Sequence, residues 1–443
     1  MAKPMNLLYI SHYFPPEVNA PAARVSEMGS RWTRKGARVT VLTGFPNHPN
    51  GVIPKEYRGK IRQVEAYNGI RLIRTWMYAA PNKGFLKRIT NYLSFMVSSI
   101  ALGAGKVGKP DVLIATSPQF FVGLSGFVLS RIKRCKFVFE IRDLWPEEIV
   151  AVGAIKNKWI ISFLESIEMF LYRKADLIVA VAQGTIDTLV KRGVPIEKML
   201  LIPNGVSMEL FVSENRGADI RSKLGFQDKI VVSYIGTHGM AHRLDTVLKA
   251  AELLKSSNPN IQFLFVGDGA EKSHLIEMAN SLGLTNVTFH DQVSRDWIAA
   301  YYQASDICLV PLRAADLFTR NIPSKIYEIM ASRRPIIIST NGESRDMVES
   351  SGAGVGVTPE DYTELAHAIR EMSKDPGQRE RMGLNGYSFA WANCSRTRWA
   401  DNYLEALNCL VGGRTLSLSQ PEPLPEKVIR GKKDRENSQA SVR

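Results

Sequence analysis

Pro323, Ser324, Lys325 and Glu328 form the cluster in this sequence with the clearest chemical potential. Proline is favoured in the first turn of a helix, so we expect a helix to begin here. The free N–H groups and the dipole at such a start attract a diphosphate, and Lys325 would add a full positive charge. About one turn later, the carboxylate of Glu328 could accept two hydrogen bonds from the vicinal diol of a ribose. The same residues would also suit an ordinary helix start with a surface Lys and Glu.

Two glycine-containing loops follow apolar runs in the same half of the chain. The loop Gly236–Arg243 lies between such a run and a segment with helical spacing. Glycine lets the backbone approach a ligand closely, and Arg243 or a histidine such as His238 could bind a phosphate. The tight turn that contains Gly267 and Asp268 has the same setting. Either loop could also be a simple connection between a strand and a helix.

A long loop near the start of the chain, Ser11–Arg24, is also a candidate for function. Its length is unusual for a connection between a strand and a helix, which favours a functional role. Within it, Asn19 and Ala20 could cover a phosphate. His12 could line a cleft or lie at the edge of the core.

A second polar stretch in this half of the chain follows the apolar run at 137–141. Glu140, Arg142 and Asp143 stand where that run ends. Charges in this position suggest a cleft rather than a core. The alternative is a structural ion pair, because buried carboxylates normally need such partners.

The elements that must position these residues alternate between apolar strands and helices. Strands that are apolar on both faces predict parallel sheets with crossover helices. The predicted strands are Asn6–Ser11, Arg38–Thr43, Ile70–Trp76, Asp111–Thr116, Lys136–Ile141, Asp176–Val181, Met199–Ile202, Ile230–Ile235, Ile261–Val266, Val287–His290, Ile307–Pro311 and Pro335–Ser339. The predicted helices of the first half are Ala22–Lys35, Phe85–Lys106, Trp159–Arg173 and Gly184–Arg192.

This pattern predicts an α/β protein with two Rossmann-like, doubly wound domains that face a cleft. The expected domains are residues 1–205 and 206–387, joined by a linker within 203–217 that is rich in Pro, Gly and polar residues. A closing helix is expected over 388–411. Residues 412–443 are polar without apolar periodicity, which predicts a disordered tail. Ligands of such folds bind at the carboxyl ends of the strands, so the loops above should meet in the cleft.

Charge and composition narrow the class of protein further. Residues 1–205 hold 29 Lys and Arg against 14 Asp and Glu, so this half carries all of the net charge of +14. Such a charge suggests an anionic partner, although it also serves solubility. The four cysteines form no CxxC pair, and no signal peptide or membrane span is expected, which favours the cytoplasm. No HExxH or Asp-x-Asp motif is present, so no metal site is predicted.

The segment 82–100 combines an apolar helical face with basic residues. Phe85, Leu86 and Ile89 lie beside Lys87 and Arg88. An interfacial helix on an anionic membrane needs this combination. The alternative is an amphipathic crossover helix packed on its sheet. Both hold if only Phe85 and Leu86 protrude.

As a set, these segments resemble retaining glycosyltransferases of the GT-B fold, family 4. The likeness is to the bacterial branch that builds O-antigen, capsule or exopolysaccharide, including fucosamine-type transferases. It covers residues 5 to about 340. The motifs that carry it are YISHYFPPEVNAPAAR, VLTGFPNHPNG, FEIRDLWPE, IPNGV, YIGTHG, FVGDG and PSKIYE.

The resemblance implies transfer of a sugar from a nucleotide donor, commonly UDP-linked, with retention and without metal or other cofactor. It implies a lipid-diphosphate-linked saccharide as acceptor. The catalytic residues would be Arg142, Asp143, Lys325 and Glu328. The donor would be bound by Gly236, Thr237, His238, Arg243, Gly267, Asp268, Arg320, Ser324 and Ile326. The acceptor side of the cleft would hold His12, Asn19, Ala20 and Glu140.

Three positions depart from the family pattern. The first of the family's paired glutamates falls on Arg320, which could instead meet an acidic or phosphate group. Arg142 replaces the usual His before Asp143. The Arg/Lys pair after the first strand of the second domain is absent, and His242 or Arg243 is the substitute. Two alternatives stay open: a nucleotide-sugar epimerase on the same fold, and a non-catalytic sugar-nucleotide-binding subunit, which the missing first glutamate suggests. No motif supports nucleic-acid binding.

Overall fold

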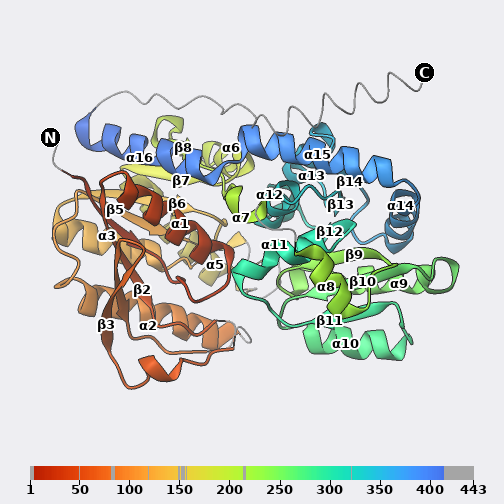
Figure 1. Cartoon of the computed structure of the whole chain (residues 1–443). Helices are drawn as coiled ribbons and strands as arrows, with labels where there is room; N and C mark the ends of the chain where they lie inside the picture. Colours follow the sequence, from red (N-terminus) through yellow and green to blue (C-terminus); the bar gives the residue numbers. More distant parts are fainter. Residues whose placement is uncertain are drawn as a thin grey trace.

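The computed structural model describes residues 4–48, 50–80, 85–117, 119–147, 150, 155, 157–212, 216–320 and 322–413. They form two α/β lobes side by side (Figure 1). The tail was predicted over 412–443, but Gly412 is the last residue of the final helix and Gly413 caps it; residues 414–443 lie outside the described residues. The doubly wound two-lobed fold is confirmed.

The N-terminal lobe is built on an eight-stranded sheet in the order β3-β4-β2-β1-β5-β6-β7-β8. All neighbours are parallel except β3 and β4. The strands are β1 (Asn6–Ile10), β2 (Arg38–Gly44), β3 (Arg62–Tyr67), β4 (Ile70–Thr75), β5 (Val112–Thr116), β6 (Lys136–Ile141), β7 (Leu177–Ala180) and β8 (Met199–Leu201). Its helices are α1 (Ala20–Arg34), α2 (Phe85–Gly103), α3 (Val122–Lys133), α5 (Lys158–Lys174) and α6 (Gln183–Lys191).

The C-terminal lobe has a six-stranded parallel sheet in the order β11-β10-β9-β12-β13-β14. Its strands are β9 (Ile230–Ile235), β10 (Ile261–Val266), β11 (Val287–His290), β12 (Ile307–Pro311), β13 (Ile336–Ser339) and β14 (Gly354–Gly356). Its helices are α7 (Glu209–Val212), α8 (Gly217–Leu224), α9 (Leu244–Ser257), α10 (Lys272–Ser281), α11 (Arg295–Gln303), α12 (Ser324–Ala331), α13 (Glu343–Ser350), α14 (Tyr362–Lys374) and α15 (Pro376–Asn393).

Both faces of the N-terminal sheet are covered, which explains why its central strands are apolar throughout. In β1, Leu8 and Ile10 pack with residues of α2, α3 and α5, whereas Leu7 and Tyr9 pack with α1 on the opposite face. Successive side chains of a strand point to opposite faces, so one apolar run supplies two cores. The layer of α2, α3 and α5 therefore covers one face, and α1 covers the other.

Two helices, rather than the single one predicted over 388–411, close the chain. α15 packs on α12 of the C-terminal lobe, and α16 (Arg396–Gly412) crosses back onto α1 (Figure 1). The chain breaks between them because Ser395 caps the second helix: its side chain accepts a hydrogen bond from the N–H of Arg398. Tyr403 and Leu407 of α16 are buried in the core around α1, so α16 belongs to the N-terminal lobe.

None of the described helices is both long enough and apolar enough to cross a bilayer. Among the same residues, no group of three or more His, Cys, Asp or Glu side chains is placed to hold a metal ion.

Candidate active site

A cavity of about 950 Å³ lies between the two lobes. The N-terminal lobe contributes the loop before α1 and the start of that helix. The C-terminal lobe contributes the ends of β9 and β10 and the first turn of α12. These are the carboxyl ends of parallel strands and a helix N-terminus, where α/β folds bind ligands.

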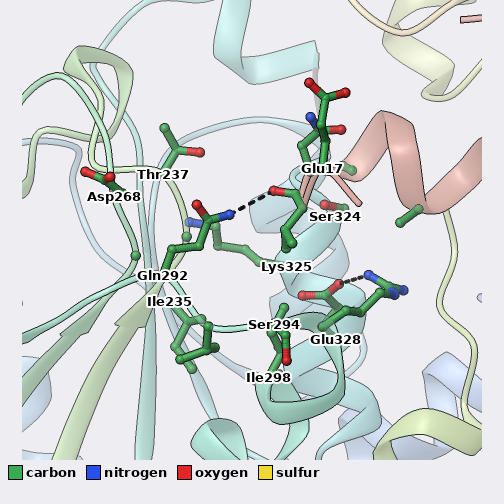
Figure 2. Close-up of a pocket in the computed structure, with 18 of the residues that line it drawn as sticks. Glu17, Ile235, Thr237, Asp268, Gln292, Ser294, Ile298, Ser324, Lys325 and Glu328 are labelled. Carbon is green, nitrogen blue, oxygen red and sulfur yellow. Dashed lines mark hydrogen bonds and ion pairs between the residues drawn. The ribbon is translucent and has the colours of Figure 1, made fainter. Parts of the chain in front are cut away.

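Lys325 is the central cation of the cavity wall. Pro323 is the residue that precedes α12, and Ser324 and Lys325 open the helix (Figure 2). The ammonium of Lys325 makes no hydrogen bond to any described residue and lies 3.8 Å from the ring centroid of Tyr234. Burial lowers the pKa of Lys325 from 10.5 to about 7, against the opposing effect of Glu328. An unpaired buried ammonium at a helix start suits an anionic ligand.

Glycine is required opposite this ammonium. A Cβ added to Gly236 would lie 2.8 Å from Lys325 Nζ, and Gly236 has a φ of +145°. A Cβ on Gly267 would lie 2.0 Å from the carbonyl oxygen of Gly236, so the two glycine loops touch each other. Thr237 and Asp268 of these loops also line the cavity, facing the helix that carries Lys325 (Figure 2).

Glu328 lies one turn after Lys325 on the same wall (Figure 2). Its carboxylate accepts a hydrogen bond from the hydroxyl of Tyr302 at 3.4 Å and lies 3.7 Å from Arg295 Nη1. Burial raises the pKa of Glu328, although Arg295 and Arg396 oppose this effect. Each carboxylate oxygen therefore has one long contact, and a carboxylate held this way can take stronger hydrogen-bond donors from a ligand.

The glycine loop provides a neutral histidine to the cavity. His242 lines it, and burial lowers the pKa of His242 to about 3. The ring of His238 instead packs edge-on against Phe265 and Phe289, away from the cavity. His238 was therefore wrongly expected in the cavity wall: its place in a βα loop could not reveal which way the ring turns.

Three further residues predicted to bind the donor do not line this cavity: Ile326, Arg243 and Arg320. Ile326 is fully buried in the core of the C-terminal lobe, because its position faces the sheet. Arg243 is held by Asp245 and Glu360. His242, which the sequence offered as the alternative to Arg243, lines the cavity instead.

Arg320 also points elsewhere. Its guanidinium contacts Thr188 of α6 at 3.3 Å and lies 3.6 Å from Glu147, both in the N-terminal lobe. Arg320 thus meets an acidic group, as the sequence analysis allowed, but the group belongs to the protein itself.

On the N-terminal side, Asn19 and Ala20 line the cavity as predicted. The side chain of Asn19 caps α1 by accepting the N–H of Ala22 at 2.9 Å. His12 lies behind this wall, with its ring edge-on to Tyr13, Tyr92 and Phe95, and burial lowers its pKa to about 3. His12 therefore lies at the edge of the core, which was the second of the two positions that the sequence allowed for it.

Glu140 is a structural residue rather than an acceptor contact. Its carboxylate is fully buried and pairs with Arg24 at 3.0 Å, and it accepts hydrogen bonds from Tyr9 and Thr116. Arg24 lowers the pKa of Glu140 against the effect of burial. The predicted role in the cleft is corrected, because the side chain turns into the sheet.

Arg142 and Asp143 lie at the end of β6, where both backbone N–H groups donate to the hydroxyl of Ser117. Burial lowers the pKa of Arg142 to about 10 and raises that of Asp143. Arg142 Nη1 has no hydrogen-bond partner within the described part of the chain. Neither residue lines the cavity between Lys325 and Asn19.

Sequence reasoning missed a group of charges that joins the lobes beside the cavity. Glu27 of α1 pairs with Arg396 at 2.6 Å and with Arg295, and Arg295 in turn reaches Glu328. The hydroxyl of Ser207 also donates to Glu27. Arg295 and Arg396 are the first residues of α11 and α16, where a cation is unfavourable without a partner, but neither helix start was predicted from the sequence.

One further contact crosses the cavity. The amide of Gln292 donates to the backbone carbonyl of Val18 at 3.2 Å, and both residues belong to the wall. Together with the charges around Glu27, this contact holds the lobes closed around the site.

Comparison with known proteins identifies the class that this fold and cavity define. The family model "Glycosyl transferase 4-like domain" matches residues 19–205, and "Glycosyl transferases group 1" matches residues 217–389. WcaI of Escherichia coli K12, named as a colanic acid biosynthesis glycosyl transferase, is 26% identical over 83% of this chain and 92% of its own length. The protein is therefore a nucleotide-sugar-dependent glycosyltransferase. It belongs to the retaining GT-B glycosyltransferases of group 1, family 4.

Solved structures share the fold. Sucrose-phosphate synthase from Thermosynechococcus elongatus matches 92% of this chain and all of its own, with a TM-score of 0.74 and 20% identity. Anabaena HepE in complex with UDP-glucose matches 91% of this chain and 99% of its own, with a TM-score of 0.69 and 17% identity.

Proposed function

We propose that this protein transfers a sugar from a UDP-linked donor to a lipid-diphosphate-linked saccharide during synthesis of a cell-surface polysaccharide. The observation that carries the donor side is the pairing of Lys325 and Glu328 on successive turns of α12, both in the cavity. The polysaccharide context rests on the name of WcaI, and the choice of UDP on the HepE complex.

In this proposal the diphosphate lies against the first turn of α12. Lys325 and the N–H groups of that turn neutralise it, and His242 lies beside it in the wall as a neutral ring. The ribose hydroxyls bind Glu328, and Thr237 and Asp268 close the site from the glycine loops. No metal is needed, because the protein itself supplies the positive charge. Arg142 and Asp143, predicted to act in catalysis, do not line the cavity and take no part in this proposal.

Transfer then follows from departure of the diphosphate. The bond between the anomeric carbon and the phosphate oxygen breaks, and the acceptor hydroxyl attacks the same face of the sugar. Its proton passes to the departing phosphate oxygen, so the configuration is retained. The charge that develops on that oxygen is stabilised by Lys325 and the helix start, and groups of this kind contribute about 3–4 kcal/mol each.

We further propose that the protein works at the cytoplasmic face of the cell membrane, where a lipid-linked acceptor is found. The excess of basic residues in positions 1–205 supports attachment to an anionic surface. In α2, Leu86 is 78% exposed whereas Tyr92 and Phe95 are buried, so most of its apolar face packs on the sheet.

A panel of nucleotide sugars and lipid-diphosphate-linked saccharides tests this proposal. Products are weighed by mass spectrometry, with and without EDTA. We expect one added sugar with a UDP donor, in either condition. An isomerised sugar nucleotide in the reaction without acceptor would support an epimerase instead. Loss of all product with EDTA would contradict the metal-free site.

A further inference from the structure

The outer face of α5 exposes large apolar side chains at its start. Trp159 is 87% exposed, Phe163 65% and Ile160 48%. Their spacing places them together on one face of the helix, while Leu164 and Leu171 on the neighbouring face are buried in the core. A cluster of exposed apolar side chains on one face marks a candidate binding surface.

The neighbouring helices extend this face. α3 packs between α2 and α5, and all three cover the same side of the N-terminal sheet. Ile132 of α3 is 54% exposed, and Leu86 and Val97 of α2 are also exposed. Apolar side chains thus protrude from each helix of the layer.

The charge of the layer is strongly one-sided. Its three helices hold seven basic residues: Lys87, Arg88, Arg131, Lys133, Lys158, Arg173 and Lys174. Only two acidic residues oppose them, and one of these, Glu168, is buried where Arg192 pairs with it. Helices with apolar side chains and basic but almost no acidic residues on their outer face complement an anionic lipid surface.

The position of the most exposed residues relates this face to the active site. α5 follows β6, and a helix that follows a parallel strand begins at the carboxyl end of the sheet. That edge faces the cleft, and Trp159 and Leu86 both stand in the first turn of their helices. Among the described side chains of the layer, they are the two most exposed large apolar ones.

We propose that the face formed by α2, α3 and α5 docks on an anionic bilayer, with Trp159, Ile160 and Phe163 as the residues that enter the interface. Tryptophan favours the boundary between headgroups and acyl chains. The basic residues of the layer hold the headgroups around it. This inference deepens the proposed function, because it puts the mouth of the cleft where a lipid-linked acceptor is presented. It also makes α5, rather than α2 alone, the main anchor.

Co-sedimentation of the full chain with vesicles tests this inference. Vesicles of phosphatidylcholine alone are compared with vesicles that also contain phosphatidylglycerol. We expect binding to the anionic vesicles, and about a tenfold lower bound fraction for the double variant Trp159→Ser/Phe163→Ser. Leu86→Ser should lower binding less. Leu253→Ser, on α9 of the other lobe and 46% exposed, is the matched control and should bind as the native chain does.

Tryptophan emission gives an independent readout of insertion. The native chain should show a blue shift with anionic vesicles, which the double variant lacks. Equal binding by the double variant and the native chain would overturn the inference. So would a native dimer that the double variant converts to monomer, since a second copy would then cover the face. Circular dichroism confirms that each variant is folded.

These assays contain no sugar donor or acceptor, so they succeed or fail independently of the transferase reaction. Conversely, transfer to a water-soluble acceptor should be unchanged in Trp159→Ser/Phe163→Ser. Vesicle binding without any transferase product would reject the proposed function and keep the docking face.

Discussion

The ammonium of Lys325 lies 3.8 Å from the centre of the Tyr234 ring, and no carboxylate of the described residues makes a hydrogen bond with it. The ring face attracts the cation but does not neutralise it, as a carboxylate would. In the proposed function, a diphosphate is the partner of this buried charge. The site is thus organised for its ligand at a cost to the empty protein.

Burial of Lys325 should make the stability of the protein depend on pH. The pKa of Lys325 is lowered from 10.5 in the unfolded chain to about 7 in the native protein. Between these values the unfolded chain binds the proton and the native one does not, so this residue makes stability rise with pH across that window. Below about pH 7 Lys325 is protonated in both states, so the full free-energy cost of burying its charge lowers the stability of the native protein. Lys325→Met should therefore raise the melting temperature near neutral pH, and the difference should shrink toward about pH 10.

Donor binding should be linked to the same proton. A bound diphosphate favours the ammonium, so the protein should take up a proton as it binds UDP near pH 8. Affinity for UDP should fall as the pH rises above 7. Calorimetry in two buffers with different ionisation enthalpies measures the uptake. Equal heats in both buffers, corrected for UDP itself, would contradict this assignment.

Glu328→Gln should act mainly on binding of the nucleoside. The amide keeps the shape but loses the charge that strengthens hydrogen bonds to the ribose, so KM for the donor should rise about 10–100-fold. A donor with a deoxyribose should lose little further in this variant. Glu371→Gln, on the exposed surface of α14, is the control and should leave KM unchanged. A normal KM in Glu328→Gln would remove the residue from the site.

Glu27→Ala should loosen the junction between the lobes. It removes the ion-pair partner of the buried Arg396 guanidinium and leaves Arg295 with its longer contact to Glu328. Loss of one partner of a buried ion pair costs about 2–4 kcal/mol of unfolding free energy. Urea unfolding measures it, with Lys374→Ala of the exposed Lys374–Glu371 pair as a control that should not change. A native midpoint in Glu27→Ala would contradict this role.

Glu140→Gln should lower stability and leave donor KM unchanged, whereas Glu328→Gln acts mainly on donor KM. Because Glu140 pairs with fully buried Arg24, its loss should lower the free energy of unfolding by about 3–5 kcal/mol. Turnover per folded molecule and donor KM should stay close to native. If activity collapses while the urea midpoint holds, Glu140 acts in catalysis after all.

The sequence was sufficient for the architecture because the buried strands of parallel sheets are apolar throughout. Five of them, Lys136–Ile141, Ile230–Ile235, Ile261–Val266, Val287–His290 and Ile307–Pro311, begin and end where predicted. β3 was missed because it is an edge strand with half of its side chains exposed and so has no apolar run. β14 was missed because its three residues, Gly354–Gly356, carry almost no pattern.

The site was predictable only where local sequence decides the geometry. The start of α12 and the glycine loops could be predicted in this way, because Pro323 fixes its own φ and Gly236 permits a φ of +145° that other residues rarely adopt. The orientation of a side chain at a strand end is a tertiary property, so His238 and Glu140 were misplaced. The junction of Glu27 with Arg295 and Arg396 joins residues hundreds of positions apart, and no local pattern announces it.

The most direct measurement is kcat/KM for the nucleotide-sugar donor in Lys325→Met. We expect about a 100–1000-fold loss, because one charge that stabilises the leaving diphosphate is removed. The variant should remain folded and be at least as heat-stable as the native protein. An unchanged kcat/KM in a folded Lys325→Met protein would contradict the account of this site.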